Sequence, residues 1–236
     1  MLCKIADLLT EIPEAGDLVP RCREYLWNGS RVDADIVIRT DLFRPGAWKT
    51  LEGDAYIYME SGTHFLFQLL KHGGMMLHAS AVVLDGKAYL FSAPCGTGKS
   101  THTRLWQQVF GPDARVINDD KPALRYVDGV WYAYGTPWCG KDGININEKA
   151  PLGGICFLKQ GSENRIRRLS QQEAIQKIIF QTMRRFKLAE SLNLMLGMVD
   201  RLVCTIPVFE LENRPEPEAA MLSHDTMAQA AKEAGL

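Results

Sequence analysis

A short glycine-rich segment, Ala93–Thr101, holds the residues best suited to bind an anion. It matches the pattern Gly-x-x-x-x-Gly-Lys-Ser/Thr, except that alanine takes the first glycine position. Gly96 and Gly98 can adopt backbone angles that other residues resist, so successive N–H groups can turn inward around a phosphate. Lys99 would place a positive charge on the β- and γ-phosphates, and Ser100 would offer Mg²⁺ a hydroxyl ligand. The expected nucleotide-binding residues are Pro94, Cys95, Gly96, Thr97, Gly98, Lys99, Ser100 and Thr101.

An acidic pair, Asp119 and Asp120, follows the short apolar run Arg115–Asn118 and lies 20 residues after Lys99 (119 − 99). Phosphoryl transfer uses a carboxylate near the metal and often a base for the attacking hydroxyl. We assign Asp119 to magnesium and Asp120 to the base, and the opposite assignment stays open. A solvated turn is the alternative interpretation of the pair.

Two further features have both a functional and a structural interpretation. His78 precedes an apolar run; it is either a core residue or a participant near the γ-phosphate, and the sequence favours neither. In the turn-rich segment Gly135–Lys141, Lys141 could contact phosphate and Trp138 could flank a nucleotide or substrate. A structural turn with a buried tryptophan is equally compatible with that segment.

The elements that position these residues alternate between strands and helices. Leu77–Leu84 and Ala88–Ser92 flank the turn dipeptide Asp85-Gly86 and predict a hairpin that leads into the glycine-rich loop. A helix over Lys99–Phe110 is closed by Gly111-Pro112. The later elements expected are a hairpin of Ala123–Val127 and Val130–Tyr134, a strand at Gly153–Leu158, helices at Ser170–Phe186 (with a Ser170–Glu173 capping box) and Leu188–Val203, and a strand at Thr205–Leu211.

The region before Met75 shows weaker patterns. Asp35–Arg39 and Asp54–Tyr58 alternate like strands, and Thr63–Lys71 is typical of a short amphipathic helix. We therefore predict a small β-rich N-terminal lobe over residues 1–74 and a P-loop kinase-like domain over residues 75–236. No Pro-, Gly- or Ser-rich linker separates the two parts, so they are expected to form one compact body.

The composition limits the classes of function. The chain has 236 residues, 46% of them hydrophobic, and a net charge of −1, so no overall field would recruit nucleic acid or an anionic membrane. The six cysteines form no Cys-x-x-Cys pair, which argues against a zinc ribbon. No apolar run approaches the roughly 18 residues of a membrane span, and the N-terminus lacks a secretory pattern. A cytoplasmic protein is expected.

The order of these residues suggests a family. His78, a hairpin, the glycine-rich loop and Val-Ile-Asn-Asp-Asp together resemble the catalytic domain of HPr kinase/phosphorylase, whose fold is similar to that of phosphoenolpyruvate carboxykinase. The resemblance covers roughly Leu77–Leu158. It implies an α/β fold with a mixed sheet and flanking helices, like the C-terminal domain of HPr kinase. It also implies that Asp120 is the acid/base for a serine hydroxyl and that His78 is the active-site histidine.

The chemistry and the resemblance together predict a magnesium-requiring phosphotransferase. It would use ATP or another nucleoside triphosphate and act on a serine-type hydroxyl of a protein, a peptide or a small molecule. A nucleotide-binding regulator or maturation factor with little turnover is one alternative, and a carboxykinase-like metabolic enzyme is another. The nucleotide preference, the acceptor and the oligomeric state stay open.

Overall fold

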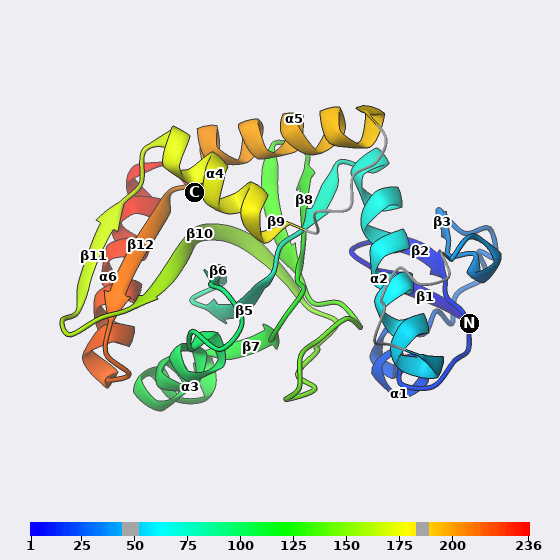
Figure 1. The fold of residues 1–236 in the computed structure, drawn as a ribbon, viewed down its shortest axis with the longest axis horizontal. Helices are drawn as coiled ribbons and strands as arrows, with labels where there is room; N and C mark the ends of the chain where they lie inside the picture. The colour runs from blue at the N-terminus through cyan, green and yellow to red at the C-terminus, as the bar shows by residue number, and fades with distance from the viewer. Residues whose placement is uncertain (44–51, 183–188) are drawn as a thin grey trace.

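The computed structural model describes residues 1–43, 52–182 and 189–236. These residues form a small sheet near the N-terminus and a larger mixed sheet with helices packed against it (Figure 1). The fold is therefore α/β with a mixed sheet, as the sequence predicts.

The larger sheet contains nine strands of the described residues. Its order is β4-β8-β9-β10-β6-β5-β7, with β12 paired to β10 and β11 paired to β12. β10 is antiparallel to β9 but parallel to β6 and β12, which makes the sheet mixed. The strands are β4 Gly74–Met76, β5 Ala79–Leu84, β6 Lys87–Ser92, β7 Arg115–Asn118, β8 Ala123–Val127, β9 Val130–Tyr134, β10 Lys149–Gln160, β11 Arg165–Arg168 and β12 Val208–Asn213.

Helices cover both faces of this sheet, and successive side chains along a strand point to opposite faces and so pack against different helices. Ala81 and Val83 of β5 belong to a core cluster shared with α4 and α5, whereas Val82 and Leu84 belong to a cluster shared with α3 and α6. Figure 1 shows α4 and α5 together on one side of the strands, whereas α3 and α6 lie apart from α4 and α5. The helices are α3 Lys99–Phe110, α4 Gln171–Gln181, α5 Ala189–Thr205 and α6 Pro217–Glu233, with a short 3₁₀ turn η3 at Gly111–Asp113.

The N-terminal region adds a three-stranded sheet and a long helix, α2. The helix stands beside the larger sheet, and the small sheet packs on its other side (Figure 1). Its core joins Phe65 and Leu69 of α2 to Ile5 and Leu18. The elements are β1 Leu2–Ile5, β2 Leu8–Glu11, α1 Leu18–Arg21, η1 Arg23–Tyr25, β3 Ile36–Val37, η2 Thr40–Leu42 and α2 Gly53–Lys71.

One predicted element in this region is wrong. Asp54–Tyr58, expected to be a strand, forms the beginning of α2, which continues to Lys71 where the sequence predicts a helix end. The apolar stripe of α2 packs on the N-terminal core, and this packing overrides the short alternation. The predicted strand at Asp35–Arg39 is reduced to β3. The division into two domains at residue 74 stays a prediction.

The hairpins and helices around the glycine-rich loop are confirmed. Asp85 and Gly86 have φ angles of 50° and 74°, and Asp128 and Gly129 have 49° and 86°, as tight hairpin turns require. The capping box predicted at the start of α4 is present. The part of that predicted helix beyond residue 182 lies outside the described residues. Among the described residues, no helix combines the length and the apolarity that crossing a membrane requires.

Candidate functional site

Three neighbouring strands bring the predicted site residues to one edge of the larger sheet. β5 begins directly after His78 and is antiparallel to both β6 and β7. β6 and β7 therefore both end at the edge where β5 begins, and the register pairs Ala79 with Ser92 and Ala81 with Asn118. β6 leads into the glycine-rich loop, and β7 leads into the acidic pair. The topology thus explains why segments far apart in the sequence meet.

The glycine-rich loop adopts a conformation suited to an anion. Gly96 and Gly98 have φ angles of 80° and 114°, in the region that favours glycine. Thr97 N–H donates to Pro94 O at 3.3 Å, and among the described residues the N–H groups of Cys95, Gly96 and Gly98 donate to no protein acceptor. The 12-residue helix α3 follows, and the N–H groups of its first turn add their partial positive charge.

Lys99 is buried at the base of this loop, with 9% of its surface exposed. Its Nζ donates to Ala93 O at 3.0 Å and lies 3.0 Å from His78 Nε2. Burial lowers the pKa of the Lys99 ammonium, and the nearby Asp120 carboxylate opposes that effect. The structure therefore brings together Lys99, His78 and Asp120, which the sequence identified separately.

Asp120 lies between two basic groups. Its Oδ1 is 3.2 Å from His78 Nε2, and its Oδ2 forms an ion pair with Lys121 Nζ. Burial alone would raise the pKa of the Asp120 carboxyl, but the side-chain contact with His78 and the charge of Lys121 outweigh it and hold the pKa well below its ordinary value. Asp120 is consequently an ionised carboxylate and a weak base in this environment.

Asn118 stabilises the turn that contains Asp119 and Asp120. Its Oδ1 accepts hydrogen bonds from the backbone N–H groups of Asp120 and Lys121 at 2.9 and 2.7 Å, and its Nδ2 donates to Thr136 O at 3.0 Å. Ser80 Oγ donates to Asp119 O at 2.9 Å. This bonding satisfies the buried polar groups of the turn and holds it against β5.

Asp119 occupies a different environment from Asp120. It is 6% exposed, and its Oδ1 accepts a hydrogen bond from Gly140 N at 2.5 Å. Burial raises the pKa of Asp119, the Gly140 bond opposes the rise, and the charge of Asp120 adds to it. The adjacent carboxylates thus have pKa values shifted in opposite directions, which is typical of side chains with different roles.

The N-terminal region holds the loop that contacts Asp119. Arg21 donates to Cys139 O at 3.1 Å, and Tyr58 Oη donates to the same oxygen at 2.7 Å. Asn145 Nδ2 in turn donates to Arg21 O at 2.7 Å. Because Cys139 precedes Gly140, these contacts from α1 and α2 determine where the Gly140 N–H lies.

The structure corrects one interpretation of the turn-rich segment. Trp138 is fully buried, stacks on Phe65 with ring centroids 4.7 Å apart, and donates from Nε1 to Ser61 Oγ at 3.0 Å. It therefore cannot flank a nucleotide, and its role is structural. Lys141 is exposed, and its contact with phosphate stays a prediction.

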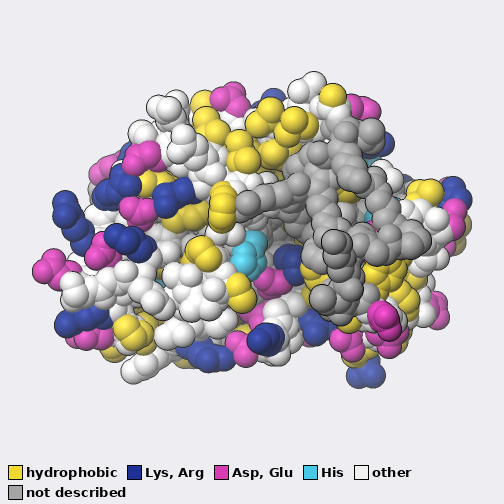
Figure 2. Space-filling view, in the orientation of Figure 1, with side chains coloured by type: hydrophobic (Ala, Val, Ile, Leu, Met, Phe, Trp, Pro, Cys, Tyr) yellow, Lys and Arg dark blue, Asp and Glu magenta, His cyan; other side chains and the backbone are white. Residues whose placement is uncertain are grey.

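Clefts lie on both sides of the glycine-rich loop. One, of about 320 Å³, is lined by Gly96–Gly98, Thr101 and His102 and by residues at and just after the ends of β10 and β12. The other, of about 310 Å³, lies toward α4 and is lined by Pro94 and Gln181. Figure 2 shows histidine, basic and acidic side chains gathered near the middle of the viewed face.

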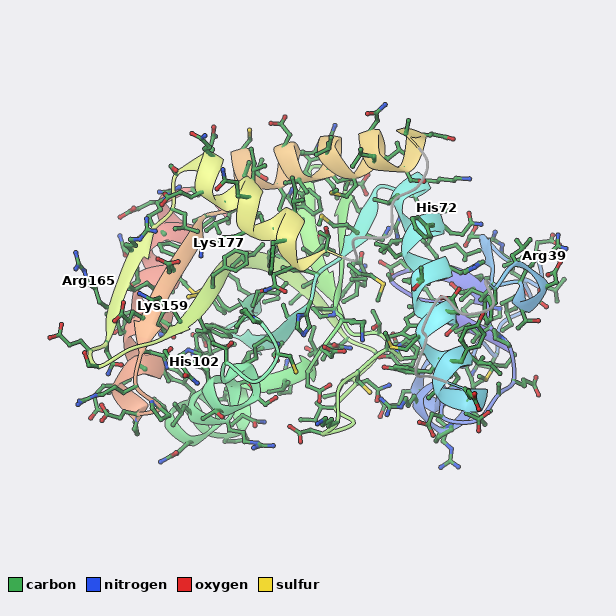
Figure 3. The ribbon with its side chains drawn as sticks, in the orientation of Figure 1. Arg39, His72, His102, Lys159, Arg165 and Lys177 are labelled. Atoms are coloured by element: carbon green, nitrogen blue, oxygen red, sulfur yellow. The ribbon has the colours of Figure 1, made fainter. Side chains whose placement is uncertain are left out.

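His102 forms a buried wall of the first cleft. Figure 3 shows it near α3, on the side of the C-terminal elements. Ser223 Oγ donates its single hydrogen to Ala220 O at 2.9 Å, so it can only accept from His102 Nε2 at 3.1 Å. His102 therefore has its proton on Nε2, while its Nδ1 has no partner among the described residues. Burial lowers the pKa of His102 to about 3, so the ring is neutral.

The residues predicted for magnesium suit that ion in type. A serine hydroxyl and a carboxylate are the oxygen ligands that Mg²⁺ prefers, and the ion usually takes few protein ligands beside phosphate and water. Ser100 is half-buried at the start of α3, and Asp119 is buried with one oxygen bonded to Gly140. Among the described residues there is no cluster of three His, Cys, Asp or Glu side chains that could hold a metal ion without phosphate.

Sequence reasoning missed several residues of the site. Lys121 was available as a neighbour of the acidic pair, and Asn118 as an asparagine before a turn. Gln181, whose Oε1 lies 3.0 Å from His78 Nδ1, gives no local signal because 103 residues separate the two. The same holds for Arg21 and Cys139.

A comparison with protein families matches residues 52–213 to the SynChlorMet cassette protein ScmC. The chain belongs to this family. The ScmC match spans the acidic pair, the glycine-rich loop and α4; of the residues named for this site, Arg21, Ala220 and Ser223 lie outside it. No curated protein matches the sequence. Among solved structures, the HPr(Ser) kinase/phosphatase from Coxiella burnetii is similar at 11% identity and a TM-score of 0.37, over 67% of this chain and 96% of that chain.

Proposed function

We propose that the protein is an ATP-dependent, magnesium-requiring phosphotransferase that acts on a serine-type hydroxyl, with a P-loop and an HPr-kinase-like catalytic arrangement. The observation that carries the proposal is the cluster of Lys99, His78 and Asp120 at the foot of the glycine-rich loop, with 3.0 and 3.2 Å between neighbouring groups. A cation for phosphate and a carboxylate for a hydroxyl proton are the two groups that phosphoryl transfer needs side by side.

The residues would act as follows. Loop N–H groups and Lys99 would bind the β- and γ-phosphates, with the loop residues Pro94–Thr101 around them. Asp120 would accept the acceptor's hydroxyl proton while the hydroxyl oxygen bonds to the γ-phosphorus. The bond from that phosphorus to the β-phosphate oxygen breaks, which leaves ADP and a phosphorylated acceptor. Ser100 and Asp119 would hold Mg²⁺, which supplies positive charge to the phosphate oxygens when bound.

His78 would tune the basicity of Asp120. A carboxylate paired with Lys121 and contacted by His78 is a weak base, so it must lose part of this pairing to take a proton. A polyphosphate that draws the Lys99 ammonium from His78 Nε2 would change the hydrogen bonding of His78 and therefore that of Asp120. Nucleotide binding would in this way prepare the base.

The weak basicity of Asp120 also favours a second candidate. If the Asp120–Lys121 ion pair persists with nucleotide bound, the protein would bind nucleotide and turn over slowly, as a regulator or maturation factor. This candidate shares the nucleotide site and differs only in chemistry, so binding alone does not separate the two.

Two substitutions test the proposal. Lys99→Ala should abolish the rise in melting temperature that MgATP produces, because it removes the buried cation at the loop. Asp120→Asn should keep that rise but lower phosphoryl transfer by about 100-fold or more, the range of a lost acid–base group. Transfer is measured with γ-labelled ATP, Mg²⁺ and, as acceptors, free serine and a degenerate serine-containing peptide library.

Asp41→Asn removes an exposed carboxylate that pairs with Arg39 in the N-terminal region, outside the cluster, and should change neither readout. If the wild-type protein binds MgATP but transfers no label to any acceptor, the result supports the second candidate, a regulator or maturation factor. An Asp120→Asn variant with full transfer activity contradicts the assignment of the base.

A further inference from the structure

Gln181 contacts His78 through both its backbone and its side chain. The carbonyl oxygen of Gln181, at the C-terminal end of α4, accepts a hydrogen bond from His78 N–H at 3.0 Å. This bond satisfies one of the carbonyl groups that a helix end leaves without an internal partner. Gln181 Oε1 lies 3.0 Å from His78 Nδ1. Gln181 is 9% exposed, so water competes little for its amide.

The chemistry of these atoms determines where His78 carries its proton. An amide oxygen only accepts, so a hydrogen bond to Gln181 Oε1 requires that His78 Nδ1 carries a hydrogen. In the neutral ring, Nε2 is then the atom with the lone pair. That lone pair faces Lys99 Nζ at 3.0 Å and can accept from it.

The protonated ring would keep the contact with Gln181 but not the one with Lys99, because an ammonium group cannot accept a hydrogen bond. With hydrogens on both nitrogens, Nδ1 still donates to Gln181 Oε1, and Nε2 donates to Asp120 Oδ1 at 3.2 Å. Only the partner of Nε2 changes between the two states. The proton that His78 gains or loses is therefore the one on Nε2, the nitrogen that faces Lys99 and Asp120.

We propose that Gln181 is a positioning residue that keeps a hydrogen on His78 Nδ1 and so confines proton exchange of His78 to Nε2, beside Lys99 and Asp120. The inference of the tautomer stands on these contacts alone, and its effect on phosphoryl transfer rests on the proposed function. Partners of this kind fix both the tautomer and the ring orientation of histidines in working sites.

The experiment reads the tautomer directly by NMR of the protein labelled with ¹⁵N-histidine, because protonated and bare ring nitrogens have separate chemical shifts. The chain has five histidines, and loss of a signal in His78→Asn assigns the one in question. In the wild-type protein, neutral His78 should carry its hydrogen on Nδ1. His102, whose hydrogen is fixed on Nε2 by Ser223, provides an internal reference of the opposite tautomer.

Three variants then separate positioning from folding. Gln181→Leu keeps the volume and the backbone bond but removes the acceptor, so His78 should shift toward the Nε2–H tautomer. Gln181→Glu restores an acceptor and should return the hydrogen to Nδ1. Gln176→Leu changes an exposed glutamine of the same helix, on the wall of the same cleft, and should leave His78 unchanged.

The kinetic readout follows the tautomer. Gln181→Leu should lower kcat by up to about 100-fold while KM for ATP stays the same. A hydrogen on the wrong nitrogen of His78 should reduce the rate by no more than the loss of an acid–base group would. Wild-type His78 with its hydrogen on Nε2, or a Gln181→Leu spectrum equal to wild type, would overturn the inference. The expected spectra together with no transfer to any acceptor would leave the tautomer inference standing and refute the proposed function.

Discussion

Replacing Gly140 by alanine tests whether the loop between β9 and β10 positions Asp119. A Cβ atom at residue 140 would lie 2.9 Å from Asp119 Oδ2 and 3.2 Å from its Cγ, which is closer than side-chain atoms normally approach. The carboxylate cannot simply move away, because its Oδ1 accepts a hydrogen bond from the N–H of the same glycine. We expect the variant to lose about 1–3 kcal/mol of unfolding free energy, the usual cost of overpacking a filled site.

The matched control is Gly197→Ala. Gly197 lies within α5, and among the described residues no atom comes within 4 Å of its added Cβ. Alanine there should stabilise the protein by about 0.5–1 kcal/mol, because it lowers the backbone entropy of the unfolded chain. The two substitutions are chemically identical and should shift stability in opposite directions.

Urea unfolding measures both variants. A change in the midpoint at constant slope reports stability alone. The Gly140 variant should also need more Mg²⁺ for the nucleotide-dependent rise in melting temperature, whereas the Gly197 variant should need the same amount. A Gly140 variant as stable as the Gly197 variant would refute the contact that we derive between the loop and Asp119.

Two further predictions concern polar groups that are paired in the structure. The pKa of Asp120 is lower in the folded protein than in the unfolded chain, where it is about 3.9. Ionised Asp120 therefore stabilises the fold at pH values above about 3.9, and this stabilisation is lost as the pH falls through the pKa of the folded state. In urea titrations the difference in unfolding free energy between wild type and Asp120→Asn should narrow below about pH 4; a difference that stays constant would count against the ion pair. Ser223→Ala leaves the Nε2–H of His102 and the Nε1–H of Trp106 without their acceptor, which should cost at least about 1–3 kcal/mol in the same assay; an unchanged midpoint would show that neither group donates to Ser223.

Local features were predictable from the sequence. The glycine-rich loop, the hairpin turns at Asp85-Gly86 and Asp128-Gly129, and α3 depend on residues adjacent in the chain, and the structure has them where expected. The capping box at Ser170 is of the same kind. In each case the backbone angles or hydrogen bonds of a few consecutive residues determine the element, so a single sequence carries the information.

Long-range contacts were not predictable in this way. Nothing in the sequence places the end of α4 against His78, or Arg21 against the loop before Gly140. Tertiary packing also decided the beginning of α2, where a five-residue alternation suggested a strand. The sequence therefore predicted the groups that the structure gathers at the candidate site. It missed the groups that orient them, because orientation depends on the packing of separate elements.

The position of β5 between β6 and β7 has a consequence for how the two segments of the candidate site are held. The loop at the end of β6 and the acidic turn at the end of β7 are both tied to one intervening strand by backbone hydrogen bonds. Their separation is set when the chain folds, so no domain closure is required to bring cation and carboxylate together. Variants that loosen β5 should thus disturb the geometry of the candidate site and the global stability together, since the same ladder of amide bonds supports both.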